Sequence, residues 1–252
     1  MYLKKTWKYG NRIECRKYHT SRYGVKGERR APRERATEQS VERANARAAE
    51  KKLNRLLVGN FDEGDNFVTL TYRREDRPDV KGSKKILKNF LNGMRKEYKK
   101  AGTELKYVFV TEWNGKSIHH HIVMNDIPGF SKILSRNWTY GGKNITPLYA
   151  DHDYSELAAY LIKETSLTFR DKDNPYRQRY SCSRNLKKPE ETVEVIKAES
   201  WKKLPKVPDK LRDQGYVLDV DSVYTDVDIF GYPYQEYTMI RIELPDRGRK
   251  RR

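Results

Sequence analysis

The sequence predicts a protein of the α+β class, in which an antiparallel sheet is flanked by helices and the chain is extended at both ends. Segments rich in β-branched residues alternate between polar and apolar positions, as strands with one buried face do. Longer segments repeat their apolar residues every three or four positions, as amphipathic helices do. Asn114-Gly115 separates two of the strand segments and is a strong hairpin signal, which makes the sheet antiparallel.

The first half of the chain predicts two helices with a strand between them. Residues 37–57 place apolar side chains on one helical face, and Gly59 provides a stop. Residues 66–74 alternate in polarity and predict a strand. Residues 84–99 predict the second helix, whose apolar face consists of Leu87, Phe90, Leu91, Met94 and Tyr98.

The remaining elements follow from the hairpin and from the second half of the chain. Strands at 105–113 and 117–125 flank the Asn-Gly pair. The helix at 153–165 is opened by Asp153, with Glu156 three residues later, which is the spacing of a capping box. Shorter elements complete the prediction, namely helices at 131–138 and 208–213 and strands at 144–150, 216–224 and 237–244.

The composition indicates a polyanionic partner. The chain has 252 residues with 53 Lys and Arg against 35 Asp and Glu, a net charge of +18, and nucleic acid is the simplest partner for such an excess. A merely basic soluble protein is the alternative. Cys15 and Cys182 form no CxxC pair, which argues against a zinc ribbon and suits a reducing cytosol. No membrane span, secretory signal or GxxxxGK[ST] phosphate loop is visible, so we expect a cytoplasmic protein without its own helicase.

The basic excess is concentrated near the N-terminus, where the first 60 residues carry 17 Lys and Arg against 6 Asp and Glu. Aromatic rings lie among these charges, as a groove for single-stranded nucleic acid requires. Tyr18 and Arg22 are the DNA-binding candidates here, and a strand followed by a solvated loop is the alternative. We divide the chain into a basic extension with a helix at 1–65, a core at 66–190, and C-terminal strands with a basic tail at 191–252.

Three consecutive histidines, His119 to His121, lie in the second strand of the hairpin. A two-residue turn at Asn114-Gly115 pairs Glu112 with Ser117. With this register Glu112, His119 and His121 share one face of the sheet. His120 points to the opposite, apolar face and is assigned to the core.

The shared face predicts a metal site. Glu112 and His119 are diagonal neighbours in this register, and His119 and His121 are two residues apart, so their Cβ atoms lie within ~8 Å of one another. Two imidazoles and a carboxylate suit a divalent ion such as Mn²⁺ or Mg²⁺, with open positions for water or phosphate oxygens. Polar residues on a solvated sheet face are the alternative.

The helix at 153–165 carries two tyrosines with different surroundings. Tyr154 falls among the apolar residues, whereas Tyr160 lies on the charged face, so its hydroxyl is the better candidate for water, metal or substrate. A phenol with a pKa of ~10 needs a cation to attack a phosphate, and Lys163 is one turn further along the same face. An ordinary helix surface is the alternative.

The order of these parts resembles the HUH endonucleases, named for a His-hydrophobic-His motif, and among them the rolling-circle replication initiators. The segment FVTLTY at 67–72 looks like the first family motif. The HHH run, with Glu112 upstream, looks like the metal motif. The segment YLIKE at 160–164 looks like the Tyr-x-x-Lys motif. The resemblance is to filamentous-phage gene II-like replication proteins and covers roughly residues 40–190. The chain departs from the pattern at His120, where the name requires a hydrophobic residue, and in having one tyrosine in the third motif.

The resemblance implies a sheet of about five strands related to the RNA-recognition topology, and an enzyme that nicks and joins single-stranded origin DNA. In that scheme Glu112, His119 and His121 hold the ion. Tyr160 attacks to give a 5′-phosphotyrosyl link and a free 3′-OH, and Lys163 assists.

The expected partners follow from the same scheme. They are a single-stranded replication origin in hairpin form, and a helicase and a polymerase of a bacterial host; no membrane is involved. Arg73, Arg74 and Arg184 are further candidates for contacts with the DNA backbone.

Three other functions stay open. Transposases and relaxases share these motifs, although relaxases usually place the tyrosine before the histidines. A non-catalytic protein could use the same sheet to bind single-stranded nucleic acid. A 2-His-1-carboxylate iron enzyme would leave the basic charge unexplained.

Overall fold

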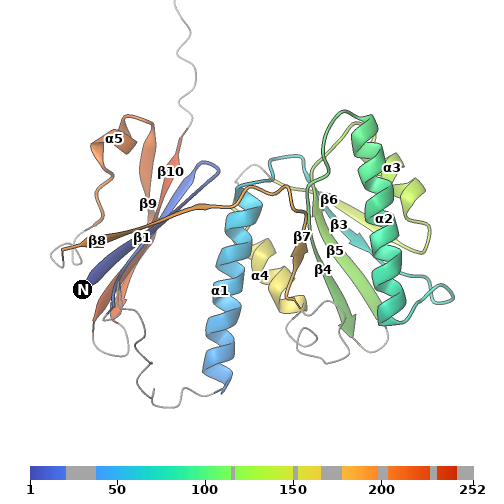
Figure 1. Cartoon of the computed structure of the whole chain (residues 1–252), viewed down its shortest axis with the longest axis horizontal. Helices are drawn as coiled ribbons and strands as arrows, with labels where there is room; N and C mark the ends of the chain where they lie inside the picture. The colour runs from blue at the N-terminus through green and yellow to red at the C-terminus, as the bar shows by residue number, and fades with distance from the viewer. Residues whose placement is uncertain are drawn as a thin grey trace, which may run out of the picture. The chain divides into compact units, whose positions relative to one another are not determined.

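The computed structural model describes residues 1–20, 38–114, 117–149, 153–165, 178–197, 204–227 and 232–242. The chain divides into two compact units. The first unit consists of Met1–Arg35 and Lys188–Arg252, and the second of Ala36–Lys187. Each unit contains a five-stranded sheet, and every strand pairing is antiparallel (Figure 1). The predicted α+β class is therefore confirmed.

The sheet of the second unit has the strand order β6-β3-β5-β4-β7. β4 and β5 form the hairpin at its centre, and β3 pairs with the other edge of β5. β3 ends at Leu70, earlier than its sequence predicts, although the backbone N–H groups of Thr71 and Arg73 still donate to Gly142 and Tyr140. The strands are β3 Asn66–Leu70, β4 Tyr107–Asn114, β5 Ser117–Met124, β6 Lys143–Pro147 and β7 Ser181–Cys182.

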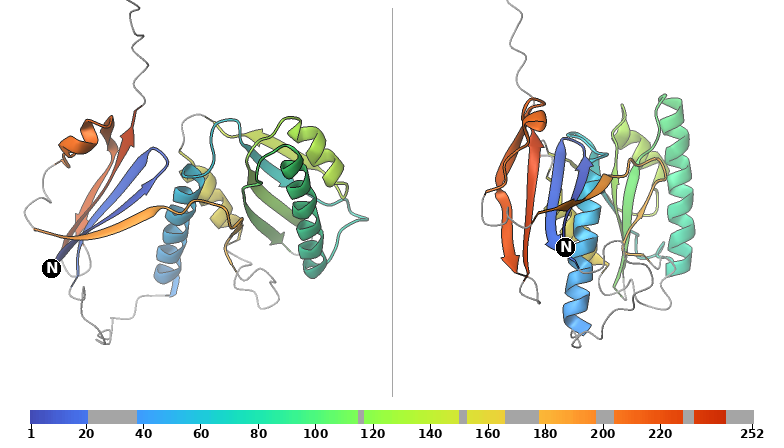
Figure 2. Two further views of the ribbon diagram at one scale, coloured as in Figure 1. Left: turned by 45° about the horizontal axis from the view of Figure 1, so that its top comes forward. Right: turned by 60° about the vertical axis from the view of Figure 1, so that its left-hand side comes forward.

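Helices cover both faces of this sheet, as two rotated views also show (Figure 2). α2 (Val80–Lys100) and α3 (Phe130–Asn137) pack against one face. α4 (Ser155–Glu164) contacts β4 on the other face and packs against α1 (Glu38–Val58). None of the described helices is long and apolar enough to cross a membrane.

The apolar face of α2 forms much of the core in the way its sequence predicts. Each of the five predicted residues, from Leu87 to Tyr98, is buried. The helix begins at Val80, four residues before its expected start, because the side chain of Asp79 caps it by accepting a 2.7 Å hydrogen bond from the N–H of Gly82. α4 also differs at its start: Tyr154 is its N-cap, while the predicted cap Asp153 accepts from the N–H of Ser155 at 3.0 Å.

The first unit joins the two ends of the chain in one sheet of order β8-β1-β2-β10-β9. Local sequence patterns leave residues 1–65 and 191–252 as separate segments, whereas Leu3 pairs with Val195 in the structure. Its elements are β1 Tyr2–Tyr9, β2 Arg12–His19, β8 Glu190–Ile196, α5 Asp209–Arg212, β9 Tyr216–Val227 and β10 Pro233–Arg241.

His120 belongs to the core of the second unit, as predicted. Its side chain is completely buried, and its Nε2 and Nδ1 atoms each lie 2.9 Å from a hydroxyl, those of Tyr72 and Thr111. Burial, assisted by the neighbouring histidines, lowers the pKa of His120 from 6.5 to about 3. The folded protein therefore holds this imidazole neutral.

Acidification should destabilise the protein through His120. The unfolded chain takes up a proton on this residue as the pH falls through 6.5, whereas the folded chain does not until about 3. The free energy of unfolding should therefore fall below pH 6.5 by up to ~1.4 kcal/mol per pH unit from this one group. Denaturant titrations in EDTA between about pH 7 and 5 measure the slope. The variant His120→Gln, which cannot be protonated, should lose stability less steeply, and equal slopes would contradict the prediction.

Candidate metal centre

The hairpin register brings Glu112 directly opposite His119, while His121 is opposite Val110. The predicted turn at Asn114-Gly115 is wrong, because Asn114 is still paired with Ser117; residues 115–116 lie outside the described residues. The partner of Glu112 moves by two residues, from Ser117 to His119. A shift of two preserves the alternation of faces, so the expected grouping of side chains is unaffected.

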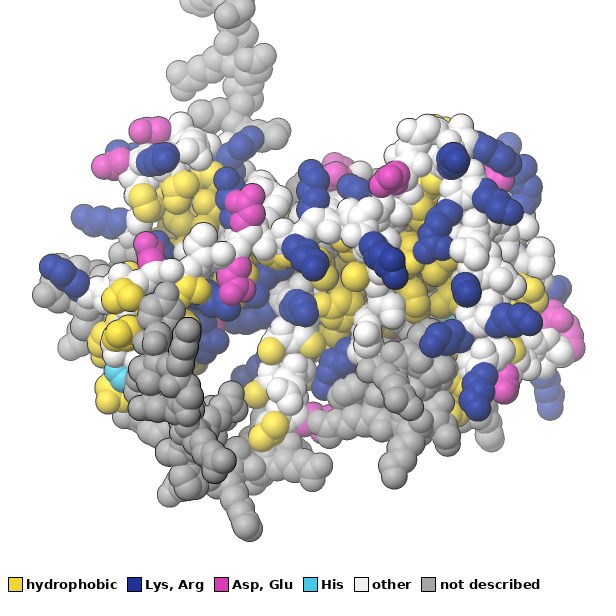
Figure 3. Space-filling model, in the orientation of Figure 1, with side chains coloured by type: hydrophobic (Ala, Val, Ile, Leu, Met, Phe, Trp, Pro, Cys, Tyr) yellow, Lys and Arg dark blue, Asp and Glu magenta, His cyan; other side chains and the backbone are white. Residues whose placement is uncertain are grey.

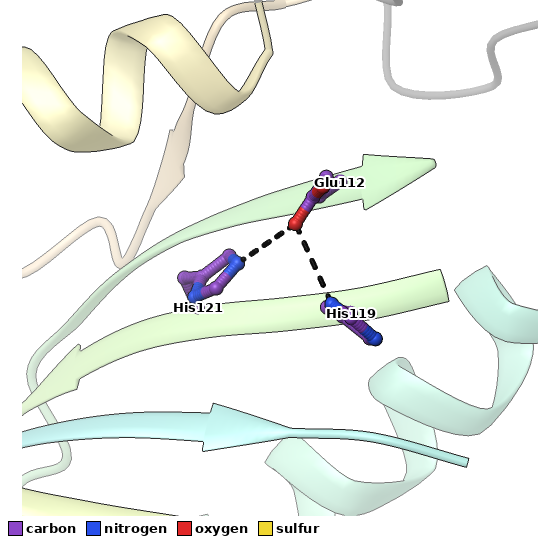
Figure 4. Close-up of side chains that lie close together, drawn as sticks. All are labelled: Glu112, His119 and His121. Atoms are coloured by element: carbon purple, nitrogen blue, oxygen red, sulfur yellow. Dashed lines mark hydrogen bonds and ion pairs between the residues drawn. The ribbon is translucent and has the colours of Figure 1, made fainter. Parts of the chain in front are cut away.

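Three side chains, those of Glu112, His119 and His121, converge on this face (Figure 4). Oε2 of Glu112 lies 3.3 Å from Nε2 of His121 and 3.5 Å from Nδ1 of His119. One donor atom from each residue can be chosen so that all three lie within 4.8 Å of one another. We refer to these residues as the triad.

The triad fits a divalent ion that keeps part of its coordination shell open. The side chain of His121 is 4% exposed, whereas those of Glu112 and His119 are 24% and 34% exposed. The donors therefore lie between a closed side, beneath His121, and a side that solvent or substrate can reach. Two imidazoles and one carboxylate could hold a divalent ion, and they would leave coordination positions for water or phosphate oxygens.

His121 is oriented by groups from β3. Its Nδ1 atom lies 3.3 Å from the hydroxyl of Thr69, and its ring stacks on that of Phe67 at a centroid distance of 6.1 Å. In the tautomer in which Nδ1 donates to Thr69, Nε2 keeps a lone pair with which it could ligate an ion; in the other tautomer Nε2 donates to Glu112. Burial lowers the pKa of His121, although Glu112 opposes the shift. Sequence patterns did not single out Thr69.

α4 brings Tyr160 to the triad. The Tyr160 ring packs edge-on against His121 and Phe67, at centroid distances of 5.4 and 6.2 Å, and the residue is 40% exposed. Tyr154, by contrast, is 4% exposed, and its hydroxyl donates to the carbonyl of Phe61 at 3.5 Å. Lys163 is exposed one turn after Tyr160. The two tyrosines therefore have the different surroundings that the helical pattern predicts.

Glu164 is a residue of this site that sequence patterns did not single out as functional. Its carboxyl hydrogen-bonds to that of Glu112, and burial together with the charge of Glu112 raises the pKa of Glu164. Two carboxyls in hydrogen-bond contact share a proton. Glu164 is four residues after Tyr160, on the same helical face, and this spacing was the available signal. Burial and the charges of Glu164 and Glu112 in turn raise the pKa of Tyr160.

The candidate DNA contacts are dispersed over the structure. Arg73 follows β3 and is exposed, and its guanidinium donates to Asp76 at 2.8 Å and to the carbonyl of Thr139. Arg74 and Arg184 are exposed in the second unit. Tyr18 lies on β2 of the first unit, where the guanidinium of Arg16 is 5.7 Å from the centre of its ring. Arg22 lies outside the described residues.

Residues 65–169 match the replication-associated protein family of ORF2 and gene II proteins. The matched segment contains Thr69, the triad and all of α4, and it leaves the sheet of the first unit outside. No curated protein and no solved structure matches the chain.

Loss of the Thr69 hydroxyl should weaken metal binding. Thr69→Val keeps the shape of the side chain but removes the group that faces Nδ1 of His121, and losses of such supporting hydrogen bonds typically cost 10- to 100-fold in metal affinity, so we expect about tenfold here. Titration calorimetry with Mn²⁺ measures the metal affinity of each protein. His121→Ala should abolish binding at the triad, and Thr146→Val, a similar change on the neighbouring strand β6, is the control. Unchanged Mn²⁺ affinity in Thr69→Val would contradict this role.

Proposed function

We propose that this chain, whose residues 65–169 match the replication-associated protein family of ORF2 and gene II proteins, initiates rolling-circle replication by nicking and rejoining single-stranded origin DNA. One observation carries the proposal. The exposed Tyr160 lies against His121 of a cluster that can hold a metal ion, within the matched segment. A potential nucleophile on α4 thus lies against residues that could hold a phosphate-binding ion.

The proposed reaction is a transesterification. The hydroxyl of Tyr160 loses its proton, and its oxygen forms a bond to the phosphorus of the scissile phosphodiester. The bond from phosphorus to the 3′ oxygen breaks, and that oxygen takes up a proton to become a free 3′-OH. The 5′ end of the strand stays linked to Tyr160 as a phosphotyrosine ester, so the reverse reaction can rejoin the strand.

The surroundings of Tyr160 support a requirement for a cation. Its pKa is raised by burial and by two nearby carboxyls, so the phenol is a weak nucleophile in the metal-free protein. The triad would hold Mn²⁺ or Mg²⁺, whose chemistry is to polarise a phosphate oxygen and to offset the negative charge that develops there. Glu164 is a further oxygen donor beside Glu112. Lys163, exposed on the same helix, would orient or neutralise the phosphate.

Basic and aromatic residues of each unit are candidates for contacts with the DNA strand. Arg74 and Arg184 are exposed on the second unit, and Tyr18 offers a ring for base stacking on the first. The free 3′-OH would serve as the primer for a host polymerase, and a host helicase would separate the strands. These steps would take place in the cytoplasm of a bacterial cell.

Replacement of the nucleophile should abolish the covalent adduct. We expect Tyr160→Phe to form no protein–DNA adduct with labelled single-stranded origin DNA and Mn²⁺ on a denaturing gel. Tyr154→Phe removes a hydroxyl from the same helix, at a buried position, and should retain the adduct. An adduct in Tyr160→Phe would assign the attack to another residue. If the wild-type protein binds the DNA but forms no adduct, a non-catalytic binding protein becomes the better description.

The three histidines should differ in their contributions. His119→Ala and His121→Ala should abolish adduct formation, because each removes an imidazole from the triad. His120→Gln should retain it at temperatures at which the variant is folded, because His120 contacts Tyr72 and Thr111 on the opposite face. Circular dichroism measures folding in parallel. Full activity in a folded His121→Ala protein would contradict the proposed site.

A further inference from the structure

Helix α2 has an unusual distribution of charge. Its 21 residues include eight Lys and Arg and one acidic residue, Glu97. α1 is equally long but intersperses five basic residues with three glutamates. Like charges three or four residues apart destabilise a helix, and interspersed acids relieve that repulsion. α2 therefore carries repulsion that its own sequence does not neutralise.

The lysines of α2 form a stripe along one side of the helix, which the exposed Asn92 interrupts between Lys88 and Lys96. Successive residues turn by 100° about a helix axis, which places five exposed lysines within one sector, on the side away from the buried residues of the helix. From first to last the stripe is ~27 Å long, at 1.5 Å per residue. Its members are Lys81, Lys85, Lys88, Lys96 and Lys99.

α3 adds two exposed basic residues on the flank of α2 that carries Glu97. It packs beside α2, and Lys132 and Arg136 are exposed on it. Arg136 lies 3.7 Å from Glu97, the single acid of α2, which also pairs with Lys100 at 2.8 Å. Figure 3 shows Lys and Arg side chains gathered over the part of the second unit that α2 occupies.

The basic stripe is on the opposite side of the sheet from the triad. α2 and α3 pack on the face that contains Ile118, Ile122 and His120, whereas His119 and His121 point to the other face. A DNA strand held at Tyr160 therefore does not account for these lysines, and the stripe calls for a second polyanion contact.

We propose that the stripe on α2, together with α3, binds the phosphate backbone of duplex DNA. Single-stranded DNA is bound by cations interleaved with rings on which bases stack. Both aromatic side chains of α2, Phe90 and Tyr98, are buried, so the exposed face of the helix is cationic without stacking platforms. Cations alone suit a regular array of phosphates, and a stripe of ~27 Å matches about eight base pairs at 3.4 Å each. The contact would be independent of sequence and would hold the duplex on the side of the sheet opposite the proposed nicking site.

Neutralisation of the stripe should weaken duplex binding and its salt dependence. In Lys81→Gln/Lys85→Gln/Lys88→Gln, each lost phosphate contact should reduce the slope of log K against log salt by ~0.9, up to ~2.7 in total. Affinity for an arbitrary duplex of about 20 base pairs should fall at least ~10-fold. Fluorescence anisotropy of the full-length chain in EDTA measures both. Lys52→Gln/Lys206→Gln/Lys210→Gln removes three exposed charges elsewhere and should have a smaller effect.

Several outcomes would overturn the proposal. The first is an unchanged slope of log K against log salt in the α2 variant. The second is a loss of duplex affinity in the control variant as large as that in the α2 variant. The third is a loss of affinity for an oligo-dT strand in the α2 variant as large as its loss for the duplex. Loss of binding to phosphatidylserine vesicles with duplex binding intact would also overturn it, because it would assign the stripe to a membrane. The α2 variant should melt at the same temperature as the wild type or higher, since repulsion is relieved, so misfolding can be recognised.

This measurement is independent of the nicking chemistry. EDTA removes the cation, and anisotropy needs no covalent adduct, so duplex binding can be lost while Tyr160 still reacts with a short single strand. If the wild-type protein forms the adduct but the α2 variant binds the duplex as tightly as the wild type, only the role of α2 is overturned. If the wild-type protein forms no adduct but the α2 variant binds the duplex more weakly, only the proposed function is overturned.

Discussion

The pleat of strand β5 is the constraint on which the site of the second unit depends. Consecutive side chains of a strand point to opposite faces, so three adjacent histidines cannot line one site. His120 is held in the core by Tyr72 and Thr111, and this leaves His119 and His121 on the face of Glu112. A slip by one residue would place two imidazoles in the core. The buried, neutral histidine thus helps to maintain the register that assembles the triad.

The electrostatics of the site favour a cation. Glu112 and Glu164 are close enough to share a proton, and both raise the pKa of Tyr160. Without a positive charge this arrangement opposes formation of a phenolate. A divalent ion held there would offset the charge of these carboxyls, which is the charge that opposes the phenolate. The carboxylate of Glu112 therefore both raises the pKa of Tyr160 and belongs to the group that could hold a divalent ion.

The two faces of the central sheet carry different kinds of charge. The face under α4 has acids, imidazoles and one reachable tyrosine, which suits chemistry at a single phosphate. On the other face, α2 and α3 pack their apolar residues against the sheet. The side of α2 that points away from the sheet carries exposed lysines. Lysines in a row can contact several phosphates at once, and such contacts do not distinguish one base sequence from another. The sheet thus separates the proposed reactive site from the proposed binding surface, and the two have no residues in common.

Local patterns in the sequence were sufficient to determine the helices, most strands and the faces on which their side chains lie, because a period of 2 or 3.6 residues relates only near neighbours. They grouped Glu112 with His119 and His121 even though the turn was misplaced, since a shift of two residues preserves the pleat. Only the tertiary structure placed Thr69 behind His121 and Glu164 against Glu112. It also paired Leu3 with Val195 in a single sheet. Each of these contacts joins residues on different elements that are 52 or more positions apart, and no local period encodes which distant segments meet.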